Sequence, residues 1–239
     1  MSIKFEKTNV MNFEGAIRGM RNSFDSWDKS DSVFYFFTFT DTEEDIKLSE
    51  MCGGIVPIIG SNDLALAQKL IKAGSDHRKF LRQIFVSVDI TAPLYWWKEF
   101  DTYKVGTVAN SCSTMHTIHN KPIKLSDFSC EHLINEPLTE IEPGIINTYN
   151  LQAKLISEVL IGVLNGSREM YLKTKDKKYW WQMIQLLPSS YNQKRTVTLN
   201  YETLRNIYGS RRNHKLTEWS EDFMGWIDSL PYSEELIKI

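Results

Sequence analysis

The stretch Ile84-Phe-Val-Ser-Val-Asp-Ile-Thr-Ala-Pro-Leu-Tyr-Trp-Trp-Lys-Glu-Phe100 decides the fold. Apolar residues recur at every second position from Ile84 to Ile90, which predicts a strand with one apolar face. Pro93 breaks this strand and is tolerated in the first turn of a helix, so we expect a helix over Leu94 to Phe100. A strand, a proline break and an aromatic helix therefore form the central unit.

Further elements flank this unit on both sides. Ser32 to Thr40 is aromatic and β-branched and predicts a strand. A helix is expected from Asn62, which can cap it, to Gly74, where a helix can end. Later helical patterns begin at Ser126 and cover 147–165, 180–187, 201–210 and 216–229, with a β-branched run, Thr196-Val-Thr-Leu, between them. Helix dominates and at least two or three strands accompany it, which indicates an α+β protein.

The composition is that of an ordinary globular domain. The chain has 239 residues, of which 42% are hydrophobic and 24% charged, with 28 Lys and Arg against 30 Asp and Glu. This length and the absence of a linker predict one domain over residues 1–239. The formal net charge of -2 argues against nucleic acid as the partner, since such domains are usually basic. Small ligands and protein partners remain.

The cysteines and the hydropathy pattern indicate the cellular compartment in which the protein is expected. Cys52, Cys112 and Cys130 are odd in number and form no Cys-x-x-Cys motif, so a reducing environment is the simpler interpretation. The N-terminal residues have no signal-peptide pattern, and no window is long and apolar enough to span a bilayer. We therefore expect a soluble cytoplasmic protein with no membrane partner.

Cys112 is the first candidate for chemistry. It stands between two serines and precedes His116 and His119, so it is either a nucleophile with a nearby base or a small loop cysteine. The His-x-x-His spacing lacks a third ligand at a recognised offset, so no metal site is expected. Neither a Walker signature nor Gly-x-Gly-x-x-Gly occurs, which argues against P-loop and Rossmann enzymes.

Two polar groups near the C-terminal end have binding chemistry. The run 211–215, Arg-Arg-Asn-His-Lys, either grips an anion or is a solvated helix end. Asn200 and Asn206 either cap turns or bind a ligand. The Tyr-Trp-Trp triplets that start at Tyr95 and Tyr179 favour buried aromatic packing, with stacking on a nucleobase or flavin ring as the alternative.

Two segments of the chain together resemble the flavin-dependent thymidylate synthases. In that family a strand runs into Ala-Pro, an aromatic helix, an Arg-His-Arg signature and a serine eight residues further on. Here Ala92-Pro93 begins the match, Thr102-Tyr103-Lys104 replaces the signature, and Cys112 stands at the serine position. Upstream, Leu70, Lys72, Gly74 and Phe80 fit the frame, and His77 lies near the flavin-contacting histidine of the family.

The second segment follows the family pattern more closely. Leu187-Pro188, the run that ends in Asn200, Leu204, Asn206, Arg211, His214 and Glu218 occur in the family order. Departures also occur, since Ile184 and Thr114 stand where the family has arginines. The matches cover roughly residues 64–115 and 183–219, and the loss of cationic donors predicts weaker binding of deoxyuridylate.

The resemblance implies a fold, ligands and site residues. It implies a small, mainly antiparallel sheet packed with several helices, FAD as cofactor, a pyrimidine nucleotide such as dUMP as ligand, and a homotetramer. If the protein is catalytic, NADPH and methylenetetrahydrofolate are further cofactors, and C5 methyl transfer is the reaction. The implied flavin contacts are His77, Lys104, Asn200 and Asn206; the implied substrate contacts are Glu99, Cys112, Arg211 and Arg212; the catalytic candidates are Cys112, Lys104 and Tyr103.

Three functional hypotheses follow. The first is a divergent flavin-dependent enzyme of this kind. The second is a non-catalytic oligomer that sequesters or senses a nucleotide, which the missing Arg-His-Arg signature favours. The third is a nucleic-acid binder that uses the basic runs 173–178 and 211–215, and the negative overall charge argues against it.

Overall fold

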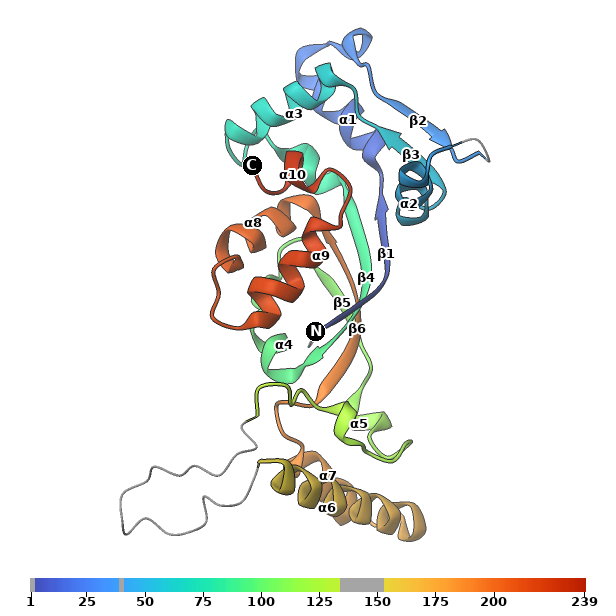
Figure 1. Ribbon diagram of the computed structural model, residues 1–239, viewed down its shortest axis with the longest axis vertical. Coiled ribbons are helices and arrows are strands. Elements are labelled where there is room, and N and C mark those ends of the chain that lie inside the picture. Colours follow the sequence, from blue (N-terminus) through green and yellow to red (C-terminus); the bar gives the residue numbers. More distant parts are fainter. Residues whose placement is uncertain (1–2, 39–40, 134–152) are drawn as a thin grey trace, which may run out of the picture.

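The computed structural model describes residues 3–38, 41–133 and 153–239. The molecule is elongated, with an antiparallel sheet in its middle (Figure 1). The order of the four strands is β1-β4-β6-β5, and each pair is antiparallel. Their bounds are Lys4–Met11 for β1, Phe85–Pro93 for β4, Val108–Ser111 for β5 and Asn192–Asn200 for β6. The predicted α+β class with a small antiparallel sheet is confirmed.

Strand β4 has the alternation that the sequence predicts. Val86, Val88 and Ile90 are buried, whereas the alternate residues from Phe85 to Thr91 keep partial exposure. The strand pairs with β6 from Phe85 opposite Asn200 to Pro93 opposite Asn192. One face of the sheet therefore carries the core and the other is open.

Helices cover the apolar face of the sheet. These are α4 (Leu94–Phe100), α8 (Tyr201–Arg211) and α9 (Met224–Asp228), which lie on the same side of the sheet in Figure 1. A π-helical segment, Glu218–Phe223, leads into α9, where the sequence predicted one helix over 216–229. The buried rings of Trp96 and Trp219 lie 4.6 Å apart at the centre of the aromatic core.

The second tryptophan doublet does not share that burial. Trp96 and Trp97 are fully buried, as predicted, but the Trp181 side chain is 50% exposed on α7 (Lys177–Leu186). The reason is that the partner helix, α6 (Ala153–Thr174), covers the opposite side of α7, where Met183 is buried. The prediction of buried packing is thus wrong for Trp181.

A second layer of elements lies beyond one end of the sheet. Strands β2 (Val33–Phe36) and β3 (Ile55–Ile58) form an antiparallel pair beside α1 (Phe13–Arg21), α2 (Glu43–Met51) and α3 (Ser61–Lys72) (Figure 1). The predicted cap Asn62 is wrong, because α3 already begins at Ser61. Asp31 instead accepts hydrogen bonds from the backbone N–H groups of Asn62 and Asp63 at 2.9 and 3.1 Å.

The opposite end of the molecule is formed by α5 (Thr114–Thr117), α6 and α7. It has its own small core of Ile118, Ile123, Phe128, Leu164 and Met183. The helix predicted over 147–165 runs to Thr174, and its first residues lie outside the described ones. The pattern from Ser126 is only a 3-10 turn, Leu125–Asp127. Short elements complete the chain: 3-10 helices Asn22–Phe24, Trp27–Lys29 and Lys79–Gln83, and α10, Ser233–Leu236.

Within the described ranges, no helix has the length and apolar character needed to cross a bilayer. The prediction of a single domain over the whole chain stays a prediction.

Candidate functional site

The start of α8 organises the main candidate site. The side chain of Asn200, the last residue of β6, accepts a hydrogen bond from the backbone N–H of Thr203 at 2.9 Å and so caps the helix. An Asn cap satisfies one of the free N–H groups in the first turn. Of the two interpretations of Asn200 from sequence, the capping role is therefore present.

The loop after α4 rests on this cap. Thr203 Oγ1 donates to the carbonyl of Val105 at 3.1 Å. Gly106 has a φ of 75° and lies so close that a Cβ would stand 2.6 Å from Asn200 Nδ2 and 2.9 Å from Thr203 Oγ1. Glycine is required here both for the left-handed backbone and for the close approach.

Loop and helix enclose a pocket of about 400 Å³. It is lined by Arg82, Thr102, Tyr103, Lys104, Val105, Gly106, Asn200, Glu202, Thr203 and Asn206. The structure thus brings together Tyr103, Lys104, Asn200 and Asn206, which come from two segments of the sequence about a hundred residues apart. Its volume is within the roughly 300–1,000 Å³ of small-molecule sites.

The pocket has a net positive character. Its one carboxylate, Glu202, accepts two hydrogen bonds from Arg78 Nε, at 3.0 and 2.9 Å, and is neutralised by this ion pair. In the described part of the chain, neither Arg82 nor Lys104 forms an ion pair. Two cations are therefore free to meet an anionic ligand.

Glu99 organises a second cluster next to the pocket. Its Oε2 accepts hydrogen bonds from Arg211 Nη1 at 2.6 Å and from Trp219 Nε1 at 3.0 Å, and His214 Nε2 lies 3.5 Å away. Arg211 Nε also donates to Tyr103 Oη at 2.7 Å. Tyr103 thus belongs both to this cluster and to the pocket. The Arg211 charge is already paired within the chain.

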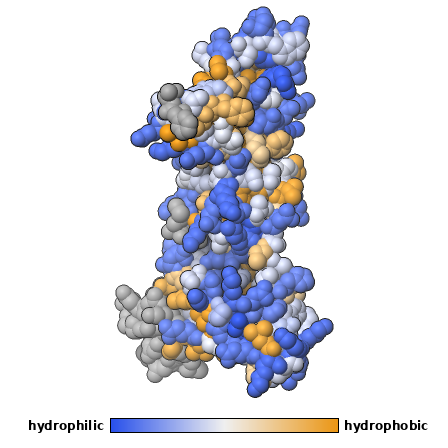
Figure 2. Space-filling model, turned by 90° about the vertical axis from the view of Figure 1, so that its right-hand side faces the viewer, coloured by the Kyte–Doolittle hydropathy of each residue, from blue (hydrophilic) through white to orange (hydrophobic). Residues whose placement is uncertain are grey.

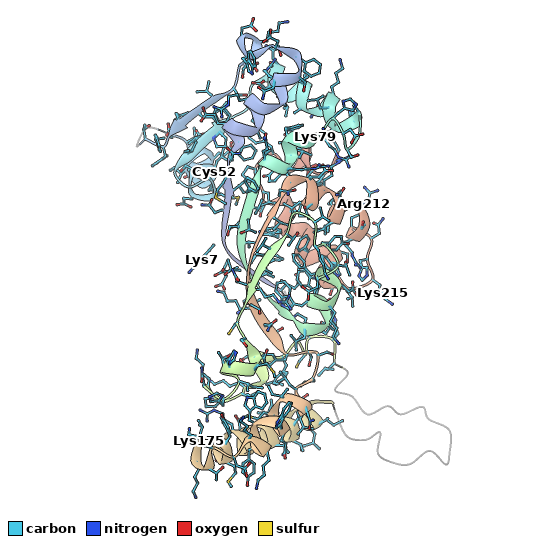
Figure 3. The ribbon with its side chains drawn as sticks, turned by 180° about the vertical axis from the view of Figure 1, so that it is seen from behind. Lys7, Cys52, Lys79, Lys175, Arg212 and Lys215 are labelled. Carbon is cyan, nitrogen blue, oxygen red and sulfur yellow. The ribbon has the colours of Figure 1, made fainter. Side chains whose placement is uncertain are left out.

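Arg212 points elsewhere. It is exposed, its guanidinium lies 5.8 Å from the centre of the Tyr208 ring, and Figure 3 shows it directed outward from α8, with Lys215 also at the surface. The sequence run 211–215 is therefore split, because only Arg211 and His214 join the Glu99 cluster.

His77 lines a different cavity, of about 220 Å³, together with Asp76, Lys79 and Gln83. The neighbouring Arg78 forms an ion pair with Glu202, which lines the α8 pocket. His77 and Asn206 do not line one pocket within the chain.

Cys112 lies at the far end of β6. Its backbone N–H donates to the carbonyl of Lys194 at 2.9 Å, and it lines a cavity of about 630 Å³ with Lys121, Lys124 and Tyr191. Lys194 and Asn200 are six positions apart on β6, which at about 3.3 Å per residue is roughly 20 Å. One chain therefore does not bring Cys112 together with Lys104 and Tyr103.

The described residues contain no group of three or more His, Cys, Asp or Glu side chains that could hold a metal ion. His119 instead packs edge-on against Tyr171 with ring centres 5.0 Å apart.

Several site residues were not singled out from sequence. Arg78, Arg82, Glu202 and Gly106 shape the α8 pocket, and Lys121 and Lys124 line the cavity beside Cys112. Gly106 comes shortly after the predicted helix Leu94 to Phe100, and a glycine there is a signal for a turn. The Arg78–Glu202 pair spans 124 residues and leaves no local pattern.

Comparison with known proteins places this arrangement in a fold class. Neither the protein-family models nor the curated proteins contain a match to the sequence. Solved structures do match: the fold is that of thymidylate synthase X. Two crystal structures of thymidylate synthase X from Helicobacter pylori, each with FAD and dUMP, superpose on the present chain with a TM-score of 0.60 at 14% sequence identity. They cover 100% of this chain and 97% and 98% of their own chains.

Proposed function

We propose that the chain binds a flavin, FAD, and a pyrimidine nucleotide on the thymidylate synthase X fold. The observation that carries the proposal is the convergence of Lys104, Asn200 and Asn206 in one pocket at the start of α8. These residues come from the two segments that resemble the family, and the similar structures from Helicobacter pylori hold FAD and dUMP.

The residues of the α8 pocket fit a flavin. The isoalloxazine edge and the phosphates of FAD need donors, which the Asn206 amide and the Lys104 and Arg82 cations supply. Tyr103 contributes an aromatic wall. When bound there, a reduced flavin would supply a hydride. Lys104 and Asn206 would orient the ring, and the helix start would favour negative charge beside it.

The nucleotide belongs to the cavity beside Cys112 in this proposal. Lys121 and Lys124 can meet its phosphate as point charges, and Cys112 takes the position that the family resemblance assigns to substrate contact. Because this cavity and the α8 pocket lie at opposite ends of β6, a complete site requires a second copy of the chain. The proposal therefore includes a homo-oligomer, and a tetramer by family resemblance.

A non-catalytic binder is the second candidate. The ion pair between Arg211 and Glu99 favours it, because a neutralised Arg211 contributes less to phosphate binding. The replacement of Arg-His-Arg by Thr102-Tyr103-Lys104 points in the same direction. A catalytic protein would in addition need NADPH and methylenetetrahydrofolate.

Titration of the purified protein with FAD, followed by flavin fluorescence, tests the proposal. We expect saturable binding that Asn206→Ala weakens at least about tenfold, the loss of roughly 1.4 kcal/mol of interaction. Asn213→Ala is the matched control, since Asn213 is exposed and does not line the pocket. Absence of FAD binding, or equal effects of both variants, would overturn the flavin site. Turnover of dUMP by the loaded protein separates the two candidates.

A further inference from the structure

A cavity of about 240 Å³ lies in the layer of elements beyond one end of the sheet, where β1 runs into α1. We call it the α1 cavity. Its walls come from the end of β1, the first turns of α1, and the pair formed by β2 and β3. Its lining shares no residue with the α8 pocket or with the cavity beside Cys112, and all of it lies outside the two segments that resemble the family. The proposed flavin and nucleotide therefore do not account for it.

One part of the lining is apolar. Val10, Phe13 and Pro57 are buried, Phe34 is partly buried, and Cys52, which Figure 3 labels, adds a buried thiol. Figure 2, with this layer at its top, shows apolar groups at the surface between hydrophilic ones. A cavity of about 150 Å³ already admits benzene, and aromatic rings contact one another favourably edge to face. The α1 cavity therefore has room for one ring or one branched aliphatic group.

Two opposite charges stand where the cavity meets solvent. Glu14 and Arg18 both line the cavity, and both side chains are exposed. Residues four positions apart lie on one side of a helix, with their Cβ atoms about 5–6 Å apart. Among the described residues, neither side chain forms an ion pair. Both charges are therefore available to a ligand, and one small charged group can reach both.

A third polar group is held beside them. Asn12 Nδ2 donates to the carbonyl of Gln83 at 2.9 Å, which fixes the amide, and a Cβ at Gly15 would collide with Asn12 Oδ1. Asn12 occupies the cap position of α1, yet its side chain accepts no capping hydrogen bond. Asn12 and Gly15 both line the cavity. Within the described part of the chain, the Asn12 oxygen is thus an available acceptor next to the turn that carries Glu14.

We propose that the α1 cavity binds a free α-amino acid with an apolar side chain, preferably an aromatic one. At neutral pH such a ligand carries a carboxylate and an ammonium group on one carbon atom. The carboxylate pairs with the Arg18 guanidinium, and the ammonium group donates to Glu14 and to Asn12 Oδ1. The side chain lies beside the rings of Phe13 and Phe34. A ligand with a carboxylate alone would meet the like charge of Glu14, and one with an amine alone would meet that of Arg18.

Calorimetric titration of the full chain with L-phenylalanine at low salt tests the proposal. We expect saturable binding with a Kd below about 1 mM, which is within the range of a ligand of this size. Glycine has the same charged groups and no side chain, so it should bind at least about tenfold more weakly. Absence of saturable binding of L-phenylalanine, or equal binding of glycine, would overturn the proposal.

Two analogues of the amino acid test the need for both charges. Phenylpropionate lacks the ammonium group, phenylethylamine lacks the carboxylate, and both keep the ring. Each should bind at least about tenfold more weakly than L-phenylalanine. Equal binding of phenylpropionate would make the ligand an apolar carboxylate, and equal binding of phenylethylamine would make it an apolar amine. Either result would overturn the assignment to an amino acid.

Variants of the two charged residues connect the binding to this cavity. Arg18→Gln and Glu14→Gln should each weaken the binding of L-phenylalanine at least about tenfold. Lys47→Gln and Glu50→Gln are the matched controls, since both residues are exposed on α2 and do not line the α1 cavity, and they should leave the affinity unchanged. Equal affinities of the parent and both cavity variants would place the ligand elsewhere and overturn the site.

A gain of binding separates recognition by Glu14 from a structural role. Because Glu14 repels a carboxylate, Glu14→Gln should bind phenylpropionate more tightly than the parent protein does. Both cavity side chains are exposed, so the melting temperatures of the ligand-free variants should stay within about 2 °C of the parent. Weaker binding of phenylpropionate by a fully folded Glu14→Gln would contradict the assigned role of Glu14.

Discussion

Arg211 Nη1 lies 2.6 Å from Glu99 Oε2, and this ion pair joins the last turn of α8 to α4. The carboxylate also accepts from Trp219, and Arg211 also donates to Tyr103, so the pair is held on both sides. An arginine bound in this way is not free to grip a phosphate. For the proposed nucleotide binding, this ion pair limits what Arg211 can contribute.

Where the proposed two-copy site brings the nucleotide to Arg211 of the second copy, Glu99→Gln should therefore raise the affinity for dUMP. The substitution removes the negative charge and keeps an acceptor for Trp219, so that Arg211 regains its attraction for anions. Calorimetric titration with dUMP at low salt should give an affinity at least about threefold higher. Asp101→Asn is the control: it removes the ion pair between Asp101 and Arg195 instead, and it should leave the affinity unchanged. A lower affinity of Glu99→Gln would mean that Glu99 itself contacts the nucleotide.

Gly106→Ala should damage both the fold and the α8 pocket. The new methyl group would stand 2.6 Å from Asn200 Nδ2, and the left-handed backbone adds strain, together on the order of 1–3 kcal/mol. Gly74→Ala is the matched control, because Gly74 also has a positive φ but has open space around its Cβ position. The difference between the two variants measures the effect of the close contact. Urea denaturation should show a larger loss for Gly106→Ala. Equal losses would show that the loop yields and that the close approach is not needed.

Part of the fold could be predicted from the sequence. Elements with a local pattern were predicted well: the alternation from Ile84 to Ile90 gave β4, and the helix after Pro93 is present. The convergence of Lys104 with Asn200 and Asn206 was also expected, but only through the family resemblance. Periodicity alone does not bring two distant segments together.

Two features that the sequence did not reveal depend on residues that lie far apart in the chain. Asn62 looked like a cap, but Asp31, on a separate segment, supplies the acceptor for the start of α3. Arg211 stays a predicted substrate contact, but its ion pair with Glu99, which lies 112 residues away in the sequence, could not be read from the run 211–215. Neither partner leaves a signal at a fixed spacing, so only the folded chain reveals them.

Asp63 should give the protein an acid limit. Its carboxylate is fully buried, accepts a hydrogen bond from Arg21 Nε at 2.5 Å and two from Ser30 and Ser32 hydroxyls at 2.7 and 2.6 Å. Burial alone raises the pKa of Asp63, but these hydrogen bonds outweigh it, and the pKa lies below its usual range. The folded state therefore favours the charged form.

The sign of the pH dependence follows from this pKa. Because the folded pKa is lower than the unfolded one, the carboxylate stabilises the fold above about pH 3.9 and loses this effect as pH falls further. Asp63→Asn leaves Arg21 buried without a counter-charge and should cost about 3–5 kcal/mol at neutral pH. Thermal melts across pH should show a shallower acid decline for Asp63→Asn. A parallel decline would assign the acid limit to other carboxyl groups.

The three cysteines should react in a fixed order with N-ethylmaleimide at neutral pH. Cys112 is exposed, Cys130 is partly buried and Cys52 is buried. Burial raises the pKa of Cys52 to about 12, and burial together with Glu131 raises that of Cys130. Thiolate is the reactive form, so mass spectrometry should find Cys112 labelled first and Cys52 only after unfolding.

The same labelling tests the proposed nucleotide site. A phosphate held by Lys121 and Lys124 would stand in the cavity that Cys112 lines, so saturating dUMP should slow the labelling of Cys112 and leave Cys130 unchanged. Cys112→Ser should keep the melting temperature, because the side chain is exposed and its contact with the sheet runs through its backbone N–H to Lys194. If bound dUMP leaves the Cys112 rate unaltered, the nucleotide lies elsewhere. The cluster around Glu99 and Arg211 then becomes the site to test, because a nucleotide there would have to displace the ion pair that the chain already contains.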